Sequence, residues 1–174
     1  MGELSDPEAF RELFDAHFDA LFRYIAHRLG DLGAAEDLAA ETFVRAIRGR
    51  AGFRRERDGS LRAWLFAIAT NLLRDEARGR RRHRAALARF SSGVVPSVDE
   101  PEFEFPDPVL AAALAGLRPE EREALLLLAW AELSYEEIAA VTGVAVGTVR
   151  SRLSRARAHL VADLARPIAE RSTS

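Results

Sequence analysis

The segment from residue 133 to 157 constrains the fold of this chain more than any other, because only a few residues separate two helical patterns there. Ser134 can cap the first pattern by accepting a backbone hydrogen bond, and Glu137, three residues later, can reach back to the Ser134 amide. Gly143 stands at the break, where a short turn between crossed helices often needs a positive φ that glycine tolerates. The spacing therefore predicts two helices joined by a tight turn, the second beginning near Ala145.

The second of these helices has two unlike faces. Apolar residues recur at three- and four-residue steps and predict the face that packs on the first helix: Val146, Val149, Leu153, Ala156 and Leu160. Small, hydroxyl and guanidinium side chains occupy the opposite face and its flanks, and they suit a helix that enters the major groove of DNA. The candidate DNA-contacting residues are Thr148, Arg150, Ser151, Arg152, Ser154 and Arg155. The alternative is an amphipathic helix with a solvated basic face, because look-alikes of the helix-turn-helix are common.

Composition indicates a globular chain and excludes several functions. Its 174 residues, 48% of them hydrophobic, can form one medium domain or two small ones. The absence of cysteine excludes disulfides and thiolate chemistry. No apolar run is long enough to cross a bilayer and no secretory signal is visible, so we expect a cytoplasmic protein without membrane insertion. His17 and His27 lack partners at a metal-ligand spacing, and neither a metal site nor a cofactor is expected.

Charge is nearly balanced over the whole chain but unevenly distributed along it. All 25 basic residues are arginine, and the formal net charge is −2. Residues 1–90 carry 17 arginines and 14 acids, residues 91–108 carry five acids and no basic residue, and residues 109–174 carry eight of each. Because non-specific affinity for DNA comes largely from neutralised phosphates, a chain this neutral should bind DNA weakly by itself.

The N-terminal half predicts three helices. An apolar stripe predicts a long core helix ending near Gly30, and helical periodicity predicts two more at residues 34–48 and 61–78. The predicted inward residues of the second helix are Leu38, Thr42, Phe43, Ala46 and Ile47. Its other side carries Asp37, Glu41, Arg45 and Arg48, for which periodicity alone favours solvation over a binding surface.

One flank of the third predicted helix combines small, polar and guanidinium side chains. It carries Ala67, Thr70, Asn71, Arg74 and Arg78, and an arginine-rich run follows at residues 80–84. Such a surface suits single-stranded or groove-bound nucleic acid, although a charge run is often only a solvated helix end.

The predicted fold class is all-α, with two small helical domains joined by a flexible acidic linker. The first domain, of three to four helices, is expected at residues 6–84, and the linker, rich in proline and acids, at residues 85–108. The second domain, at residues 109–165, adds two helices bounded by Pro108 and Pro119 to the helix-turn-helix. Residues 166–174 are expected to form a tail.

Three motifs in this order resemble the small bacterial sigma factors of the sigma-70 family, the extracytoplasmic-function (ECF) type. The motifs lie at residues 35–46, 61–78 and 133–157, and the resemblance covers roughly residues 8–164. It implies a factor without catalytic activity of its own that directs bacterial RNA polymerase to specific promoters and initiates transcription there. It also implies that the polymerase core is contacted at its clamp coiled coil and flap, and that an anti-sigma factor is a further partner.

The resemblance assigns roles to individual residues. It implies that the second domain would bind the minus-35 promoter element through the candidate residues of its helix-turn-helix. On the first domain, residues that match the helix docking on the polymerase clamp are Asp37, Glu41, Phe43 and Arg45. The loop at 53–60 would hold a base flipped from the non-template strand of the minus-10 element. The minus-10 residues implied are Phe53, Arg54, Arg55, Ser60, Asn71, Arg74 and Arg78.

Three positions depart from the family pattern. Ala40 replaces a frequent glutamine on the polymerase-facing helix, and Ala145 replaces a proline that often opens the recognition helix. Glu132 stands where glycine often ends the helix before the helix-turn-helix. Ala40 would remove one polar contact with the polymerase, whereas neither Glu132 nor Ala145 touches the predicted DNA-facing side.

Two other classes of function remain as alternatives. A stand-alone helix-turn-helix regulator, with an N-terminal sensing or dimerisation domain, would bind specific duplexes without polymerase. An enzyme acting on DNA, such as a recombinase with a helix-turn-helix tail, would need a nucleophile beside clustered acids or metal ligands. The hydroxyls of Ser60, Thr42 and Tyr24 have no convincing catalytic setting in the sequence.

Overall fold

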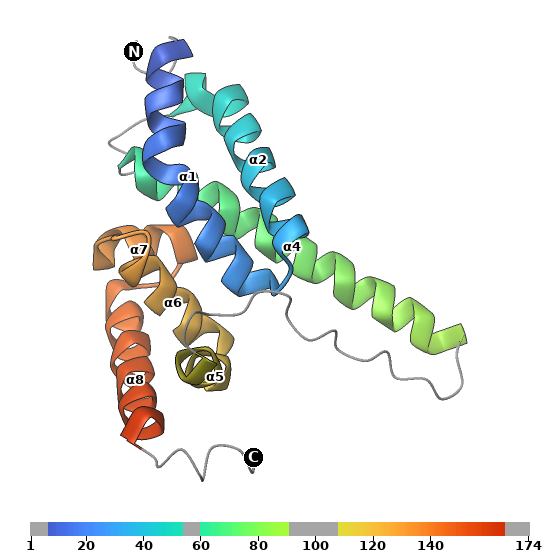
Figure 1. Ribbon diagram of the computed structural model, residues 1–174, viewed down its shortest axis with the longest axis vertical. Coiled ribbons are helices and arrows are strands. Elements are labelled where there is room, and N and C mark those ends of the chain that lie inside the picture. The colour runs from blue at the N-terminus through green and yellow to red at the C-terminus, as the bar shows by residue number, and fades with distance from the viewer. Residues whose placement is uncertain (1–6, 54–59, 91–107, 166–174) are drawn as a thin grey trace. The chain divides into compact units, whose positions relative to one another are not determined.

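The computed structural model describes residues 7–53, 60–90 and 108–165, and within these ranges all regular structure is helical (Figure 1). The all-α fold class is confirmed. The chain divides into two units, Met1–Phe103 and Glu104–Ser174. Most of the predicted linker, residues 91–107, and the predicted tail, residues 166–174, lie outside the described residues.

The N-terminal unit contains α1 (Pro7–Leu29), α2 (Leu32–Gly49), the short 3-10 helix η1 (Arg50–Gly52) and α4 (Leu61–Phe90). Only Gly30 and Asp31 separate α1 from α2. Gly30 has a φ of 73°, a conformation that costs glycine little, and the Asp31 side chain caps α2 by accepting from the Ala34 amide at 2.9 Å. This short, locally determined turn brings α1 and α2 together as packed neighbours.

Aromatic side chains fill much of the contact between α1 and α2. Phe10, Phe14 and Phe18 follow one another at four-residue steps on α1, and the Phe43 ring from α2 lies against all three. The ring centroids of Phe14 and Phe43 are 4.7 Å apart, and Phe43 is only 3% exposed. Each such pair adds about 0.5–1.5 kcal/mol beyond the burial of its area.

A buried hydrogen bond ties α1 to α4. The Tyr24 hydroxyl and the Thr70 Oγ1 atom are 2.9 Å apart, and both residues are fully buried. The Phe66 ring packs edge-on against Tyr24, with 5.4 Å between the ring centroids. Thr70 therefore belongs to the core, and its prediction as part of the nucleic-acid flank is wrong.

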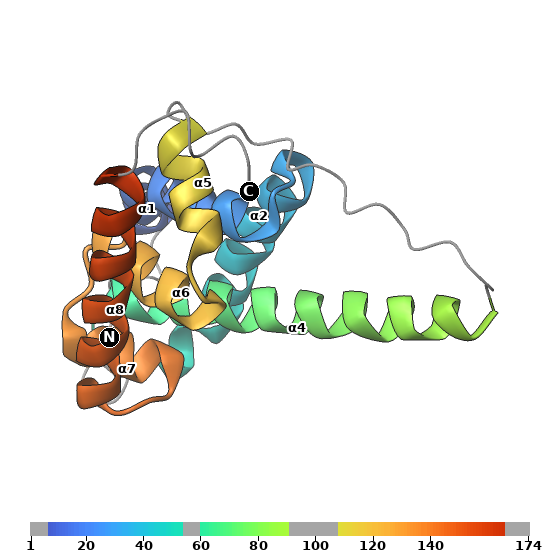
Figure 2. The ribbon, with the colours of Figure 1, turned by 90° about the horizontal axis from the view of Figure 1, so that it is seen from below.

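Helix α4 runs twelve residues beyond its predicted end at Arg78, to Phe90. Among the α4 residues whose side chains the structure describes, the last buried one is Leu73, and Figure 2 shows the remainder of the helix projecting beyond α1 and α2. Residues 84–89 consist of alanine, leucine and arginine, which are strong helix formers, and their propensities favour continuation of the helix. The first residues of the predicted linker, 85–90, are thus helical rather than flexible.

The C-terminal unit contains α5 (Pro108–Gly116), α6 (Pro119–Ala129), α7 (Tyr135–Thr142) and α8 (Val146–Ala165). Pro119 occupies the first turn of α6, as predicted. Helix α8 contacts α5, α6 and α7. The largest fully buried side chains of the unit are aliphatic: Leu126, Leu127, Leu133, Ile138, Val149 and Leu153.

Candidate nucleic-acid and partner interfaces

The turn that positions α8 is built from short-range hydrogen bonds. The Glu137 amide donates to Ser134 Oγ at 3.1 Å, and the Ser134 amide donates to Glu137 Oε2 at 2.9 Å, so the predicted capping box is confirmed. Gly143 has a φ of 73°, and its amide donates to the Ala139 carbonyl at 2.8 Å. These contacts satisfy both ends of α7 and set the direction in which α8 leaves the turn.

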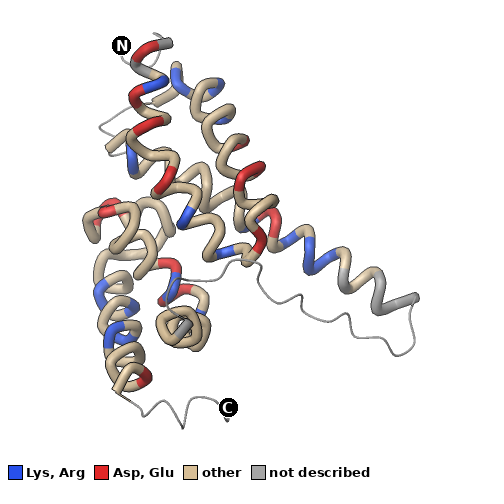
Figure 3. The backbone as a smooth tube through the Cα atoms, in the orientation of Figure 1, with Lys and Arg blue, Asp and Glu red and all other residues tan. Residues whose placement is uncertain are grey.

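Helix α8 presents the predicted DNA-reading residues on its outer side. Val149, Leu153 and Ala156 are fully buried, which confirms the predicted inward face. The structure brings all six candidates together on this one helix, and Figure 3 shows the basic residues along it. Thr148, Arg150, Ser154 and Arg155 are exposed, whereas Ser151 and Arg152 are half-buried. The Ser151 hydroxyl donates to the Thr148 carbonyl at 2.9 Å and keeps its lone pairs available as acceptors.

Two long-range contacts hold the flanks of α8. Arg155 Nε donates to Glu121 Oε1 of α6 at 2.7 Å, and Arg157 donates to the Tyr135 hydroxyl of α7 at 3.3 Å. The hydrogen bond from Arg155 is the main cause that lowers the pKa of Glu121; burial of the carboxyl opposes it, and the charges of Arg155 and Arg118 add to it. Glu121 was not among the predicted site residues. The one sequence signal that could have found it is its spacing, four residues after Leu117 and three before Ala124, both of which are buried.

Glu132 lies between α6 and α7 with a φ of 51°. This is the left-handed region, which a residue with a Cβ atom enters at a cost of about 1–2 kcal/mol. The departure from glycine noted in the sequence therefore falls on a backbone position that favours glycine.

Aromatic packing and a helix cap hold the two described ends of the predicted base-binding loop. The Phe53 ring packs on Trp64 with 5.0 Å between the ring centroids. Ser60 caps α4, because its Oγ accepts from the Ala63 amide at 3.1 Å and its carbonyl accepts from the Trp64 amide at 3.0 Å. Arg54 and Arg55, also predicted as minus-10 contacts, lie outside the described residues.

The remaining minus-10 candidates lie on α4. Asn71 and Arg78 are exposed and Arg74 is half-buried, and steps of three and four residues place them on one stripe of the helix. Arg78 forms an ion pair with Asp75, and Arg80 approaches Glu76 at 3.8 Å. Figure 3 shows basic residues continuing along the projecting part of α4.

The predicted polymerase-docking residues divide between surface and core. Asp37, Glu41 and Arg45 form an acidic and basic strip on the outer side of α2, and Arg45 Nε lies 2.7 Å from Glu41 Oε1. Phe43 does not belong to this strip. Its ring is buried among the phenylalanines of α1, so a direct contact with a partner would require the core to open, and we correct that prediction.

The hydroxyls considered as nucleophiles are engaged in structural contacts. Thr42 Oγ1 donates to the Leu38 carbonyl at 2.7 Å, Tyr24 pairs with Thr70, and Ser60 caps α4. Among the residues that the structure describes, no cluster of histidine, aspartate or glutamate is suited to hold a metal ion. None of the described helices is long and apolar enough to cross a membrane.

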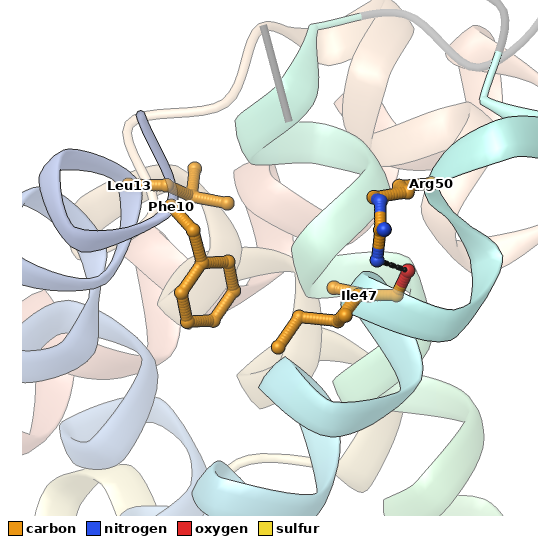
Figure 4. Close-up of a pocket in the computed structure, with 5 residues that line it drawn as sticks. Phe10, Leu13, Ile47 and Arg50 are labelled. Carbon is orange, nitrogen blue, oxygen red and sulfur yellow. Dashed lines mark hydrogen bonds between the residues drawn. The ribbon is translucent and has the colours of Figure 1, made fainter. Parts of the chain in front are cut away.

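A shallow surface depression, with no room to enclose a water molecule, lies between the start of α1 and the end of α2 (Figure 4). Its lining is Phe10, Leu13, Ala46, Ile47 and Arg50. The Arg50 guanidinium donates to the Ile47 carbonyl at 2.9 Å, and the other lining side chains are apolar. The pocket therefore offers no acid, base or nucleophile for catalysis.

Comparison with known families defines the class of both units. Sigma-70 region 2 matches residues 13–83, and Sigma-70, region 4 matches residues 109–160. The chain is similar to the ECF RNA polymerase sigma factor SigE of Mycolicibacterium smegmatis, at 38% identity over 179 residues covering 99% of this chain and 68% of the relative. It is 40% identical over 148 residues to the ECF RNA polymerase sigma factor SigC of Mycobacterium tuberculosis, covering 82% and 76%.

Solved structures agree with this class. The sigma factor RpoE from Bartonella quintana, in complex with the anti-sigma factor NepR, has a TM-score of 0.73 at 29% identity, covering 89% of this chain and 96% of that one. CnrH, in complex with the cytosolic domain of CnrY, has a TM-score of 0.67 at 32% identity, covering 93% and 92%. The chain belongs to the sigma-70 family and is a sigma factor of the ECF type, which directs the initiation of transcription. The resemblance drawn from the three sequence motifs is thereby confirmed.

Proposed function

We propose that this sigma factor selects promoters by two readings, one by each unit, joined on a single RNA polymerase. The observation that carries the proposal is the outer face of α8, which presents hydroxyl and guanidinium side chains and whose direction is set by the capped helix α7 and the left-handed Gly143 before it. A helix so exposed and so firmly oriented is suited to the major groove of the minus-35 element. The bases would be read by Thr148, Arg150, Ser151, Arg152, Ser154 and Arg155.

The minus-10 element would be read by α4 and the loop before it. The stripe of Asn71, Arg74 and Arg78 offers an amide and guanidinium groups, which can contact both bases and phosphates. The Phe53–Trp64 pair and the Ser60 cap support the ends of the loop that would hold the flipped base. Rigid supports lower the entropy lost when a loop orders around a base.

Polymerase docking is proposed for the outer side of α2. Asp37 and Glu41 provide carboxylates on an exposed helical face, with Arg45 beside them. Phe43 contributes indirectly, since its burial among the aromatic rings fixes the rotation of α2. The flap of the polymerase is proposed as the contact of the C-terminal unit.

The same family membership supports three further expectations. The protein acts without catalytic activity of its own, in keeping with the structural use of its buried and capping hydroxyls. It works in the cytoplasm, where its polymerase is found. Because RpoE is in complex with an anti-sigma factor, a comparable inhibitor is proposed for this chain.

Run-off transcription with purified bacterial core polymerase tests the proposal. A pool of fragments from the source genome is transcribed with and without the protein. We expect new discrete transcripts whose templates share two spaced elements. Specific duplex binding without any polymerase-dependent transcript would instead favour a stand-alone regulator. The absence of both specific binding and new transcripts would contradict the proposed readings.

A further inference from the structure

We propose that Glu121 is a positioning residue for DNA reading: its buried carboxylate fixes the guanidinium of Arg155 at the minus-35 interface. The inference rests on the proposed function, because it assumes that α8 reads DNA. It adds a residue from α6, a helix that carries none of the predicted contacts. The side chains of Glu121 and Arg155 meet across 34 positions of sequence.

The burial of the two partners is unequal. The Glu121 side chain is only 5% exposed, whereas the Arg155 side chain is 55% exposed. A carboxylate this buried needs a partner, because an unpaired buried charge is strongly unfavourable. Arg155 is that partner, since its Nε lies 2.7 Å from Glu121 Oε1. Burial therefore fixes the Glu121 carboxylate in place, whereas the Arg155 guanidinium remains accessible from solvent.

The atom used by the ion pair leaves the rest of the guanidinium available. Arginine has five N–H donors in a rigid plane, and the contact with Glu121 uses the Nε donor. The described residues give Arg155 no other ion pair. Fixing one edge of a planar fork orients the opposite edge, which is the geometry that bidentate recognition of guanine or phosphate requires.

The electrostatic effect of Glu121 on DNA binding has the opposite sign from its positioning effect. Removing a carboxylate from a DNA-binding surface reduces repulsion of phosphates, so by charge alone it should strengthen non-specific binding. If the carboxylate instead orients Arg155, its removal must weaken specific binding. A variant that gains non-specific affinity while losing specific affinity would separate the two effects.

The test compares Glu121→Gln with Glu120→Gln in the full-length protein bound to core polymerase. Glu120 is exposed in the same first turn of α6, so its substitution removes the same charge without touching the ion pair. The probes are a promoter duplex selected in the run-off experiment and the same duplex with a scrambled minus-35 element. We expect Glu121→Gln to lower the affinity for the selected promoter about tenfold. Glu120→Gln should change it by less than about twofold.

A double-substitution cycle distinguishes positioning from a general structural role. Once Arg155→Ala has removed the guanidinium, Glu121→Gln should cause no further loss of promoter affinity. An equal loss in both backgrounds, or an unchanged preference for the intact minus-35 element in Glu121→Gln alone, would overturn the inference. Failure of the unsubstituted holoenzyme to prefer that element would contradict the proposed function instead.

Folding of each variant is monitored in the free protein carrying Trp64→Phe, so that tryptophan fluorescence reports Trp130, which follows α6 in the C-terminal unit. If Glu121→Gln melts below the assay temperature, Glu121→Asp replaces it, since aspartate keeps the charge but is one methylene shorter. The expected loss of promoter preference and its absence in the Arg155→Ala background are the same for this variant.

Discussion

The two units of this sigma factor achieve their candidate sites by different means. In the C-terminal unit, the proposed DNA-reading residues share the helix α8, and the capping box of α7 together with Gly143, within a dozen residues, sets the direction of α8. In the N-terminal unit, the candidates are spread over α2, the loop after η1 and α4, and contacts such as Tyr24 to Thr70 join residues 46 positions apart. A site whose geometry depends on residues close in the sequence can be predicted from the sequence. A site whose geometry depends on contacts between distant residues can be predicted only in part.

The hydrophobic cores of the two units also differ in the types of side chain that they contain. Phenylalanine and tyrosine rings join the aliphatic side chains in the contacts of α1 with α2 and α4, whereas the largest fully buried side chains of the C-terminal unit are all leucine, isoleucine and valine. Each unit contains one tryptophan, Trp64 or Trp130. Variants that keep only one of them make the stability of each unit separately measurable.

The largest expected effect is the loss of the central aromatic side chain of the N-terminal unit. Phe43→Ala should destabilise that unit by about 3–5 kcal/mol, since it removes a buried ring and leaves a cavity. Denaturant unfolding followed by Trp64 should shift strongly, while the Trp130 transition should stay in place. Equal shifts of both transitions would show that the units do not unfold independently.

Acid should weaken the N-terminal unit first. Burial, with a smaller contribution from the charge of Arg23, lowers the pKa of His27 from 6.5 to about 4. As the pH falls below about 6.5, His27 is protonated in the unfolded chain but stays neutral in the folded unit. The free energy of unfolding therefore keeps its full value above pH 6.5 and decreases as the pH falls toward 4. At about 1.36 kcal/mol per unit of pKa, the loss has an upper bound of about 3 kcal/mol, reduced by the partial solvation of the ring.

The C-terminal unit should resist this range of pH. The hydrogen bond from Arg155 lowers the pKa of Glu121 below its ordinary 4.5, so the ion pair contributes stability above that value and loses it only at lower pH. Unfolding curves followed by Trp64 and Trp130 between pH 7 and 4 measure the difference. His27→Gln should make the Trp64 profile less steep, with a remaining slope from His17, whose pKa is also lowered by burial and by the charge of Arg62. A Trp130 profile that falls just as steeply as the unsubstituted Trp64 profile would contradict the comparison.

An intermediate effect is expected at the DNA interface. Arg150→Ala should weaken promoter use by about 1–3 kcal/mol if the guanidinium contacts a base, and the loss should be confined to promoters with the intact minus-35 element. Competition transcription on intact and scrambled promoters measures it. The variant should assemble with core polymerase normally.

The corresponding substitutions in the N-terminal unit should affect assembly with polymerase and leave promoter preference unchanged. Asp37→Asn combined with Glu41→Gln removes two exposed carboxylates from α2 and should weaken assembly with core polymerase, as measured by competition with the unsubstituted protein. Its relative preference for intact over scrambled minus-35 elements should not change. Unaltered assembly would remove this face of α2 from the interface.

The smallest expected effect is a gain of stability in the C-terminal unit. Glu132→Gly should stabilise it by about 1 kcal/mol, because glycine relieves the cost of a positive φ but increases the entropy of the unfolded chain. Thermal unfolding followed by Trp130 measures the change. Glu132→Ala is the control, since alanine removes the side-chain charge while keeping the Cβ atom, and it should give no such gain.

The residues that were predicted wrongly share a physical cause. Helical periodicity predicted Phe43 as an inward residue of α2, while the resemblance to a docking motif gave it a partner contact, and the packing of the α1 rings agrees with the periodicity. Thr70 is polar and stands beside Asn71, yet its hydroxyl is matched by a tyrosine on another helix. Gly79 directly follows the predicted end of α4 at Arg78, but it keeps a helical conformation and does not cap the helix, and no proline occurs before Phe90 to end it.

By itself, the sequence determined the helical class, the capping box at Ser134, the left-handed turn at Gly143 and the outward face of α8. These features depend on residues three or four positions apart, whose geometry the helix imposes. Only the tertiary structure decided that Thr70 lies in the core, that the Phe43 ring is enclosed by the phenylalanines of α1, and that Glu121 holds Arg155. Those contacts join distant residues, and their partners depend on how whole helices pack, which no local spacing specifies.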